Sequence, residues 1–267
     1  MKFDYSIHYK RFHDGSEADV NRMKAWLCTY LQADLPPDRS TPILDIGCGF
    51  GFALHALREL NYADARGLET SNEQAQFART AGFPVDVVED STDYLRRHPQ
   101  TFGAILLMDV LEHLPPGGQL EFLEALRNAL LPNGRVILTV PNANAQLASR
   151  WRYIDFTHHA SFTEHSLFFA LRSAGFGEIR MDNSKGLGPF PKGWWKREQK
   201  HAVRKWFVRW MWLQVFKAEV PPGETLDGVC FELNLKALAF NNHVLPSVDD
   251  PGRASHSDPG SGGANGV

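Results

Sequence analysis

The residues best suited to bind a small ligand lie in the stretch Asp45-Ile46-Gly47-Cys48-Gly49-Phe50-Gly51. A glycine lets the backbone turn sharply and lets a ligand approach the chain without meeting a Cβ atom. The apolar residues 43–46 predict a short buried strand, and residues 52–60 predict a helix whose first N–H groups are free to bind. This order predicts a nucleotide-binding loop in which Asp45 can hold a cationic or hydroxyl-bearing group.

A second group of reactive side chains lies in the aromatic stretch 151–165, where Asp155 precedes the pair His158-His159. The unperturbed pKa of histidine is about 6.5, so a neutral imidazole can take a proton near neutral pH. A carboxylate three residues earlier can orient such a ring. We therefore predict that His158 or His159 acts as a general base, oriented by Asp155.

The spacing of the glycines argues against a dinucleotide site. That fingerprint is G-x-G-x-x-G, but here Phe52 stands in the last position and the third glycine is Gly51. The D-x-G-x-G-x-G form instead resembles the first motif of class I S-adenosylmethionine (SAM)-dependent methyltransferases. The resemblance covers roughly residues 40–240, and it implies that the loop, Cys48 included, lies against the aminoacyl part of SAM.

The resemblance assigns further cofactor contacts to the ends of the next two strands. Glu69 ends a predicted strand at 65–69, with Thr70 beside it, and an acid there can accept both ribose hydroxyls. The adenine is held in this family at the end of strand three, predicted at 85–90. This chain has Asp90-Ser91 where the family often has Gly-Asp, so the contact stays open between these two residues.

The triplet Leu111-Glu112-His113 follows the fourth predicted strand, 102–108. It resembles a branch of the family that includes ubiquinone-biosynthesis O-methyltransferases and many sugar and polysaccharide methyltransferases. In that branch the segment borders SAM and the acceptor, which implies Met108 and Asp109 as cofactor contacts and His113 as the second candidate base. Asp109, Glu112 and Asp155 could serve a metal, but no ligand spacing demands one, and we predict none.

The elements that must position these residues alternate between strands and helices of 10 to 12 residues. This alternation predicts a parallel sheet with helices on both faces. With the resemblance, the expected fold is a Rossmann-like, doubly wound α/β sheet of seven strands. Strand seven, 229–237, runs antiparallel between strands five (135–140) and six (177–181). Every loop singled out above follows the C-terminal end of a strand, where ligands bind in open α/β sheets.

Three additions to the domain at 40–240 are expected. Residues 1–39 hold a helix that begins at Ser16, and they either fold over the SAM pocket or only pack on the sheet. Residues 241–267 are rich in Asp, Ser, Gly and Pro and are predicted to be disordered. The connection at 186–226 between strands six and seven is far longer than a hairpin needs.

The insert at 186–226 concentrates positive charge and aromatic side chains. Seven basic residues and one acid lie between Lys192 and Arg209, and a helix is predicted from Glu198 to Lys217. Three roles are open: a lid over the site, a contact in a homodimer, or an anchor through 192–217 to anionic lipid.

Composition excludes several classes. The 267 residues carry a net charge of −3, which argues against a nucleic-acid partner. The three cysteines form no C-x-x-C pair, so neither a disulfide framework nor a zinc site is indicated. From residues 1–5 we expect no apolar leader, and from the lack of a run of about 18 apolar residues we expect no membrane-spanning helix. We expect a cytoplasmic protein, with peripheral contact at the inner membrane face as one role of the insert.

The predicted reaction is O-methylation with SAM as cofactor. The aromatic loop favours a sugar hydroxyl of a glycan or surface polysaccharide, or of its lipid-linked precursor, because aromatic rings stack on sugar faces. The alternative acceptor is a quinone-like or phenolic metabolite. A non-catalytic SAM-binding subunit is a third hypothesis, which would need neither a base nor an acceptor pocket.

Overall fold

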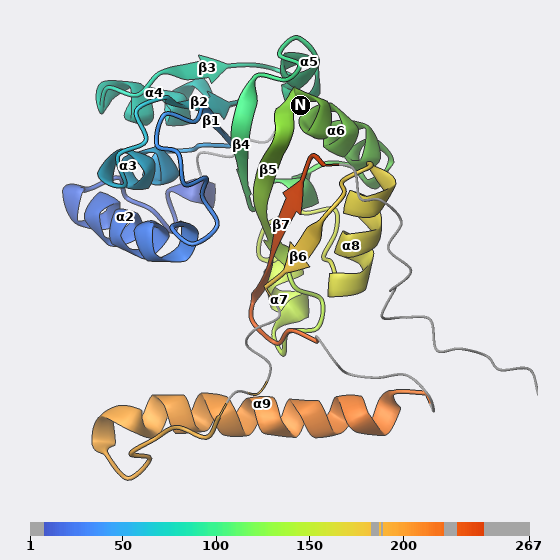
Figure 1. The fold of residues 1–267 in the computed structure, drawn as a ribbon. Coiled ribbons are helices and arrows are strands. Elements are labelled where there is room, and N and C mark those ends of the chain that lie inside the picture. Colours follow the sequence, from blue (N-terminus) through green and yellow to red (C-terminus); the bar gives the residue numbers. More distant parts are fainter. Residues whose placement is uncertain (1–7, 183–186, 188, 222–228, 243–267) are drawn as a thin grey trace, which may run out of the picture.

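The computed structural model describes residues 8–182, 187, 189–221 and 229–242, and a seven-stranded sheet lies at its centre (Figure 1). The strands are β1 (Ile43–Ile46), β2 (Ala65–Glu69), β3 (Val85–Val87), β4 (Phe102–Met108), β5 (Leu130–Pro141), β6 (Ile179–Met181) and β7 (Asn234–Phe240). Their order is β3-β2-β1-β4-β5-β7-β6, and only β7 runs antiparallel to its neighbours. The Rossmann-like doubly wound fold is thereby confirmed, with the antiparallel strand seven between strands five and six.

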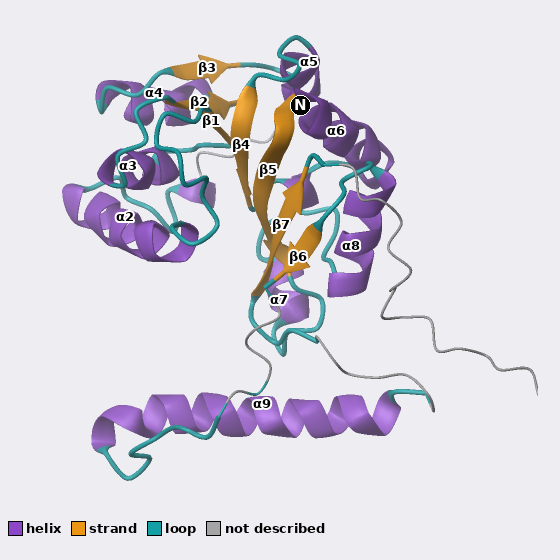
Figure 2. Cartoon of the chain, viewed as in Figure 1, coloured by secondary structure: helices purple, strands orange, loops and turns teal. Residues whose placement is uncertain are grey.

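Helices cover both faces of this sheet (Figure 2). The helices of the described chain are α2 (Glu17–Leu31), α3 (Phe52–Glu59), α4 (Asn72–Thr80), α5 (Ser91–Arg96), η1 (Leu111–His113), α6 (Pro116–Ala129), α7 (Ala148–Tyr153), α8 (Glu164–Ser173), η2 (Arg197–Gln199) and α9 (Lys200–Glu219), of which α9 lies beyond the end of the sheet. Side chains of α2, α3 and α4 share one buried cluster with Leu106, and those of α5, α6 and α8 share another with Leu107. Successive residues of β4 thus point to opposite cores, as the period of a strand requires.

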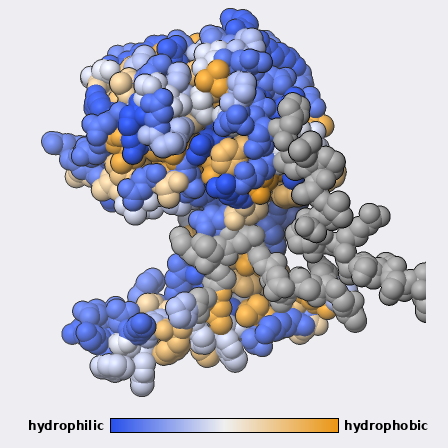
Figure 3. All heavy atoms as spheres, in the orientation of Figure 1, coloured by the Kyte–Doolittle hydropathy of each residue, from blue (hydrophilic) through white to orange (hydrophobic). Residues whose placement is uncertain are grey.

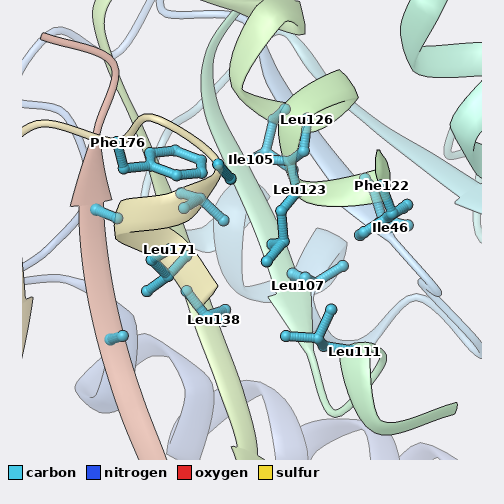
Figure 4. Packing of buried hydrophobic residues seen from close by; sticks show 14 of the residues in the cluster. Ile46, Ile105, Leu107, Leu111, Phe122, Leu123, Leu126, Leu138, Leu171 and Phe176 are labelled. Atoms are coloured by element: carbon cyan, nitrogen blue, oxygen red, sulfur yellow. The ribbon is translucent and has the colours of Figure 1, made fainter. Parts of the chain in front are cut away.

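The core between α6, α8 and the sheet is tightly filled (Figure 4). Phe122, Leu123 and Leu126 of α6 and Leu171 of α8 lie against strand residues such as Leu138, and all five are fully or almost fully buried. Each such side chain contributes about 1.5–3 kcal/mol when it leaves water. This packing fixes the sheet, and with it the loops at the C-terminal ends of the strands.

The predicted helix start at Ser16 is confirmed by a capping hydrogen bond, and two other helices begin in the same way. Ser16 accepts from the backbone N–H of Asp19 at 3.2 Å, and Ser71 accepts from that of Gln74 at 3.4 Å. Thr163 caps α8 in a reciprocal capping box with Ser166. These polar residues end the preceding loops and fix the residue at which each helix begins.

Several predicted boundaries are wrong by a few residues. Strand seven was expected at 229–237, but β7 begins only at Asn234, because the side-chain amide of Asn142 donates to the carbonyls of Cys230 and Glu232 and holds that segment as a loop. Strand three stops at Val87, before the residue that caps α5. Strand six covers 179–181 rather than 177–181, and the insert helix covers 200–219 rather than 198–217.

Parts of the predicted additions lie outside the described residues: 1–7 of the N-terminal segment, 186, 188 and 222–226 of the insert, and the tail from 243 onward. Within the described part of the chain, no helix is long and apolar enough to cross a membrane.

Candidate active site

A cavity of about 1080 Å³ opens at the C-terminal ends of β1, β2 and β4. Among the residues predicted from the sequence, Asp45, Gly47, Cys48, Glu69, Thr70, Ser91, Met108, Asp109, His113, Asp155 and His158 line it. The N-terminal segment also lines it, through residues such as Tyr9, Met23 and Trp26. The volume is large enough for a cofactor and an acceptor together, since single small-molecule sites measure about 300–1,000 Å³.

The three glycines adopt left-handed backbone conformations, with φ of 69° at Gly47, 53° at Gly49 and 82° at Gly51. A Cβ atom at Gly47 would lie 2.7 Å from Val110 Cγ2, and one at Gly49 would lie 2.6 Å from the hydroxyl of Tyr9. Neither Gly49 nor Gly51 lines the cavity; they shape the turn from β1 into α3. The loop is therefore a cradle that only glycine permits.

Glu69 at the end of β2 is buried and ties the glycine loop to the next strand. Its Oε2 accepts from the backbone N–H of Gly49 at 2.9 Å, and its Oε1 accepts from those of Thr70 at 2.7 Å and Ser71 at 2.9 Å. A carboxylate offers about four acceptor positions, so it can bind a ligand hydroxyl while keeping these bonds. The carboxylate is thus held rigidly where it faces the cavity.

Asp45 is 2% exposed, and its carboxylate has no hydrogen-bond partner among the described residues. Burial, together with the negative charge of Glu69, raises the pKa of Asp45 to about 8. A cationic ligand group beside it would offset both effects. A buried acid without a protein partner, next to a glycine cradle, fits a cofactor that carries a positive charge, as SAM does.

Of the other predicted cofactor contacts, those at the ends of β3 and β4, three line the cavity and one does not. Ser91 and Met108 line the cavity, whereas Asp90 does not, because its carboxylate caps α5 by accepting from the N–H of Thr92 at 2.7 Å. Asp109 has a positive φ of 55°, which is rare outside glycine and occurs often at functional sites. Its Oδ1 accepts from the hydroxyl of Thr139 at 2.8 Å, and burial raises its pKa.

The predicted catalytic residues converge on η1. His113 and His158 contact each other edge to face, with ring centroids 4.6 Å apart. Nε2 of His158 lies 4.0 Å from a carboxylate oxygen of Glu112 and 4.0 Å from one of Asp155. His159 is not part of this group: it is exposed, does not line the cavity, and its backbone N–H donates to the carbonyl of Glu112 at 2.7 Å. The fold thus brings His113 and His158 together and leaves His159 outside.

A hydrogen-bond chain connects Asp155 to His113 through Thr157. The hydroxyl of Thr157 lies 2.7 Å from Oδ1 of Asp155, which can only accept when ionised, so the hydroxyl donates there. It must then accept from Nδ1 of His113, 2.8 Å away. This fixes the proton of the neutral ring on Nδ1 and leaves the lone pair on Nε2. His158 is held in the same tautomer, because its Nδ1 donates to the carbonyl of Trp151 at 3.0 Å.

The protonation states follow from burial. Desolvation, with a contribution from His158, lowers the pKa of His113 to about 4, and desolvation also lowers the pKa of His158. Burial and the charge of Asp109 raise the pKa of Glu112 well above its ordinary value. Burial opposes ionisation of Asp155 too, but hydrogen bonds from Thr157 outweigh it and lower its pKa. At neutral pH the cluster therefore holds two neutral imidazoles and one ionised carboxylate.

Three of these side chains could also hold a metal ion. Ligand atoms of Glu112, His113 and His158 all lie within 4.8 Å of one another. Glu112 is fully buried, and neither of its carboxylate oxygens has a hydrogen-bond partner among the described residues. Sequence spacing did not indicate this group, because His158 comes from a different loop than the other two.

Sequence reasoning missed other contributors. Thr157 lies two residues after Asp155, and both its backbone N–H and its hydroxyl bond to that carboxylate, a turn that polar side chains often make. His8 places its Nε2 3.3 Å from Oδ2 of the same carboxylate. The spacing of Asp155 and Thr157 was a local signal, whereas nothing local predicted the approach of His8.

Comparisons with known proteins agree with this geometry. A family model described as a methyltransferase domain matches residues 20–179. A ubiquinone biosynthesis O-methyltransferase of Photobacterium profundum is 30% identical over 109 residues, 39% of this chain and 45% of that protein. One from Roseobacter denitrificans is 26% identical over 195 residues, 64% of this chain and 76% of that protein. The chain thus spans less than half the length of the first of these relatives.

Solved structures show the same fold. A SAM-dependent methyltransferase from Archaeoglobus fulgidus superimposes with a TM-score of 0.62 at 19% identity, covering 89% of this chain and all of that one. The matched family model spans the glycine loop, Glu69 and η1, which are the elements that build the cavity. The chain belongs to the class I SAM-dependent methyltransferases.

Proposed function

We propose that this chain transfers the methyl group of SAM to the hydroxyl of a phenolic or quinone-like acceptor. SAM supplies a methyl group already activated as a sulfonium, so the S–CH₃ bond breaks as the O–CH₃ bond forms. Asp45, the glycine loop, Glu69 and Ser91 would hold the cofactor. The protein's remaining work is to align the acceptor and to remove its proton.

His113 is the proposed base, with His158 beside it as the alternative acceptor of the proton. The chain from Asp155 through Thr157 leaves Nε2 of His113 with a lone pair, and His113 lines the cavity. Asp155 is ionised and can stabilise the imidazolium that forms when the proton arrives. This arrangement reverses the order predicted from the sequence, in which His158 or His159 came first.

The position of His113 favours an acidic hydroxyl as the acceptor. The ring lines the cavity, and burial lowers its pKa to about 4, which makes it a weak base. A weak base removes a proton more readily from a phenol, whose pKa is about 10, than from an aliphatic hydroxyl, which is about as weakly acidic as water.

Two further observations support this acceptor class. The relatives reported above are named as ubiquinone biosynthesis O-methyltransferases. The cavity also offers apolar surface from Met23, Leu27 and Ile154. A sugar hydroxyl, the first expectation from the sequence, stays a prediction; Trp26 and Trp151 line the cavity and could stack on a sugar ring.

The test is mass spectrometry after incubation with isotope-labelled SAM and matched acceptors, a set of catechols and a set of sugars of similar size. A gain of one labelled methyl group on a catechol, lost in His113→Ala, is the expected result. Methylation of sugars alone would refute the phenolic acceptor. Full activity in both His113→Ala and His158→Ala would refute the base.

A further inference from the structure

Four side chains of α9 contact the rest of the protein along one stripe, and Trp206 beside this stripe meets Phe190 edge to face at 5.0 Å. Arg209 and Lys205 form ion pairs with Glu232 at 2.7 and 3.5 Å. Trp212 donates its indole N–H to the carbonyl of Asn144 at 2.9 Å, and Phe216 meets Phe231 edge to face at 5.4 Å. The residues 205, 209, 212 and 216 follow one face of a helix at spacings of three and four.

The opposite face of α9 is apolar and exposed. We call Phe207, Trp210, Met211 and Val215 the outer face; their side chains are 51%, 39%, 48% and 49% exposed. Phe207 and Trp210 stack on each other at 5.9 Å. Figure 1 shows α9 at the end of the molecule beyond α7, and Figure 3 shows hydrophobic side chains along it. A helix of about 30 Å thus presents apolar surface to its surroundings.

Positive charge continues the outer face toward the start of the helix. Lys200 and Arg204 lie in line with Phe207 at spacings of four and three residues, and Lys192 and Arg197 lie just before them. All four are exposed, and none forms a salt bridge with another described residue. Lys205 and Arg209, which pair with Glu232, belong to the stripe that contacts the rest of the protein, and Lys196 pairs with Glu198 at 3.9 Å just before the helix.

We infer that the outer face of α9 and its basic end bind the surface of an anionic lipid bilayer. Aromatic and aliphatic side chains enter the headgroup region while Lys and Arg meet lipid phosphates. The charge favours lipid as the occupant, because four exposed basic groups without a salt bridge to another described residue lie beside the apolar face and match an anionic surface. The helix is not apolar enough to span a membrane, which agrees with surface binding.

This placement would bring the active site to the bilayer. Glu232, which pairs with α9, also lines the cavity, as does the adjacent Leu233. An acceptor dissolved in or attached to lipid could then reach the cavity without crossing bulk water. Lipid binding by α9 does not depend on which hydroxyl is methylated. An experiment on vesicle binding and an experiment on methyl transfer therefore test the two proposals independently.

The test is co-sedimentation of the full chain with vesicles of phosphatidylcholine alone and with added phosphatidylglycerol. Binding to the anionic vesicles, weakened by salt, is expected. Phe207→Ser with Trp210→Ser should abolish it. Lys200→Ala with Arg204→Ala should lower the affinity about 25-fold, which is about five-fold for each charge.

Two matched controls lie elsewhere on the surface. Phe169 of α8 is 73% exposed and Arg97 is exposed after α5, so Phe169→Ser and Arg97→Ala should leave vesicle binding unchanged. Absence of binding at low salt would overturn the inference, and so would binding that the α9 variants do not alter. Dimers in sedimentation velocity that Phe207→Ser with Trp210→Ser dissolves, without vesicle binding, would assign the face to a second copy and also overturn it.

Discussion

Replacing Thr157 with valine tests whether Asp155 acts on His113 through the intervening hydroxyl. Valine keeps the shape of the side chain but removes the hydroxyl that accepts from Nδ1 of His113 at 2.8 Å and donates to Asp155 at 2.7 Å. The backbone N–H of residue 157 still donates to Asp155 at 2.8 Å, so the loop keeps an anchor. The perturbation is therefore confined to His113, with its tautomer, and to one of the two hydrogen bonds that Thr157 donates to Asp155.

The expected loss follows from the cost of a buried polar group that loses its partner, about 1–3 kcal/mol. His113 can avoid part of this cost by moving its proton to Nε2. The ring then has no lone pair on Nε2 with which to take the proton of the substrate hydroxyl. Either outcome raises the barrier of the chemical step. Turnover should fall about 5- to 150-fold, while the affinity for SAM stays within a factor of two or three.

The assay is steady-state kinetics over a range of pH, with SAM affinity measured by calorimetry. Thr157→Ser restores the hydroxyl and should regain most of the turnover, which a merely space-filling role of Thr157 would not predict. The pH profile of the valine variant should also differ from that of the wild type, because the base has lost its link to an ionised carboxylate. Wild-type turnover in a folded Thr157→Val protein would refute the relay.

Three further outcomes are expected. Glu69→Ala should weaken SAM binding by roughly 1.5–3 kcal/mol in calorimetry, because the carboxylate no longer braces the loop or meets the cofactor; unchanged affinity would remove it from the site. Gly49→Ala should abolish SAM binding, since its Cβ would lie 2.6 Å from the Tyr9 hydroxyl at a φ of 53°; the exposed Gly117→Ala, where nothing lies within 4 Å, is the control. Glu112→Gln should be more stable than the wild type in urea at pH 7.5, and the difference should shrink toward pH 5. In the folded protein the pKa of Glu112 is raised well above 4.5, whereas in the unfolded chain this carboxyl ionises near pH 4.5. The free energy of unfolding of the wild type therefore falls as the pH rises above 4.5, and that of the variant does not change for this reason. A destabilised variant would show that the carboxylate is ionised and paired, as it would be with a bound cation.

Local pattern predicted the parts of the fold that local physics decides. Ser16, Ser71 and Thr163 mark helix starts because each satisfies N–H groups of its own helix. The beginning of β7 could not be predicted in this way. The segment 229–233 has the apolar character of a strand. The side-chain amide of Asn142, about ninety residues earlier, donates hydrogen bonds to two of its carbonyls, and the segment is therefore a loop outside the sheet.

The candidate site shows the same division between local and distant causes. The glycine loop, Glu69 and the triplet at η1 were recognisable because each is a contiguous motif at the end of a strand. The choice among three histidines was not recognisable, since it depends on where two loops meet: His113 and His158 face the cavity and share Asp155, whereas the neighbouring His159 turns to solvent. Neighbouring residues of a loop can point in opposite directions, and the sequence alone does not show which of the two points into the cavity. The base was therefore predicted as a set of candidates, and the hydrogen bond from His113 to Thr157 is what ranks them.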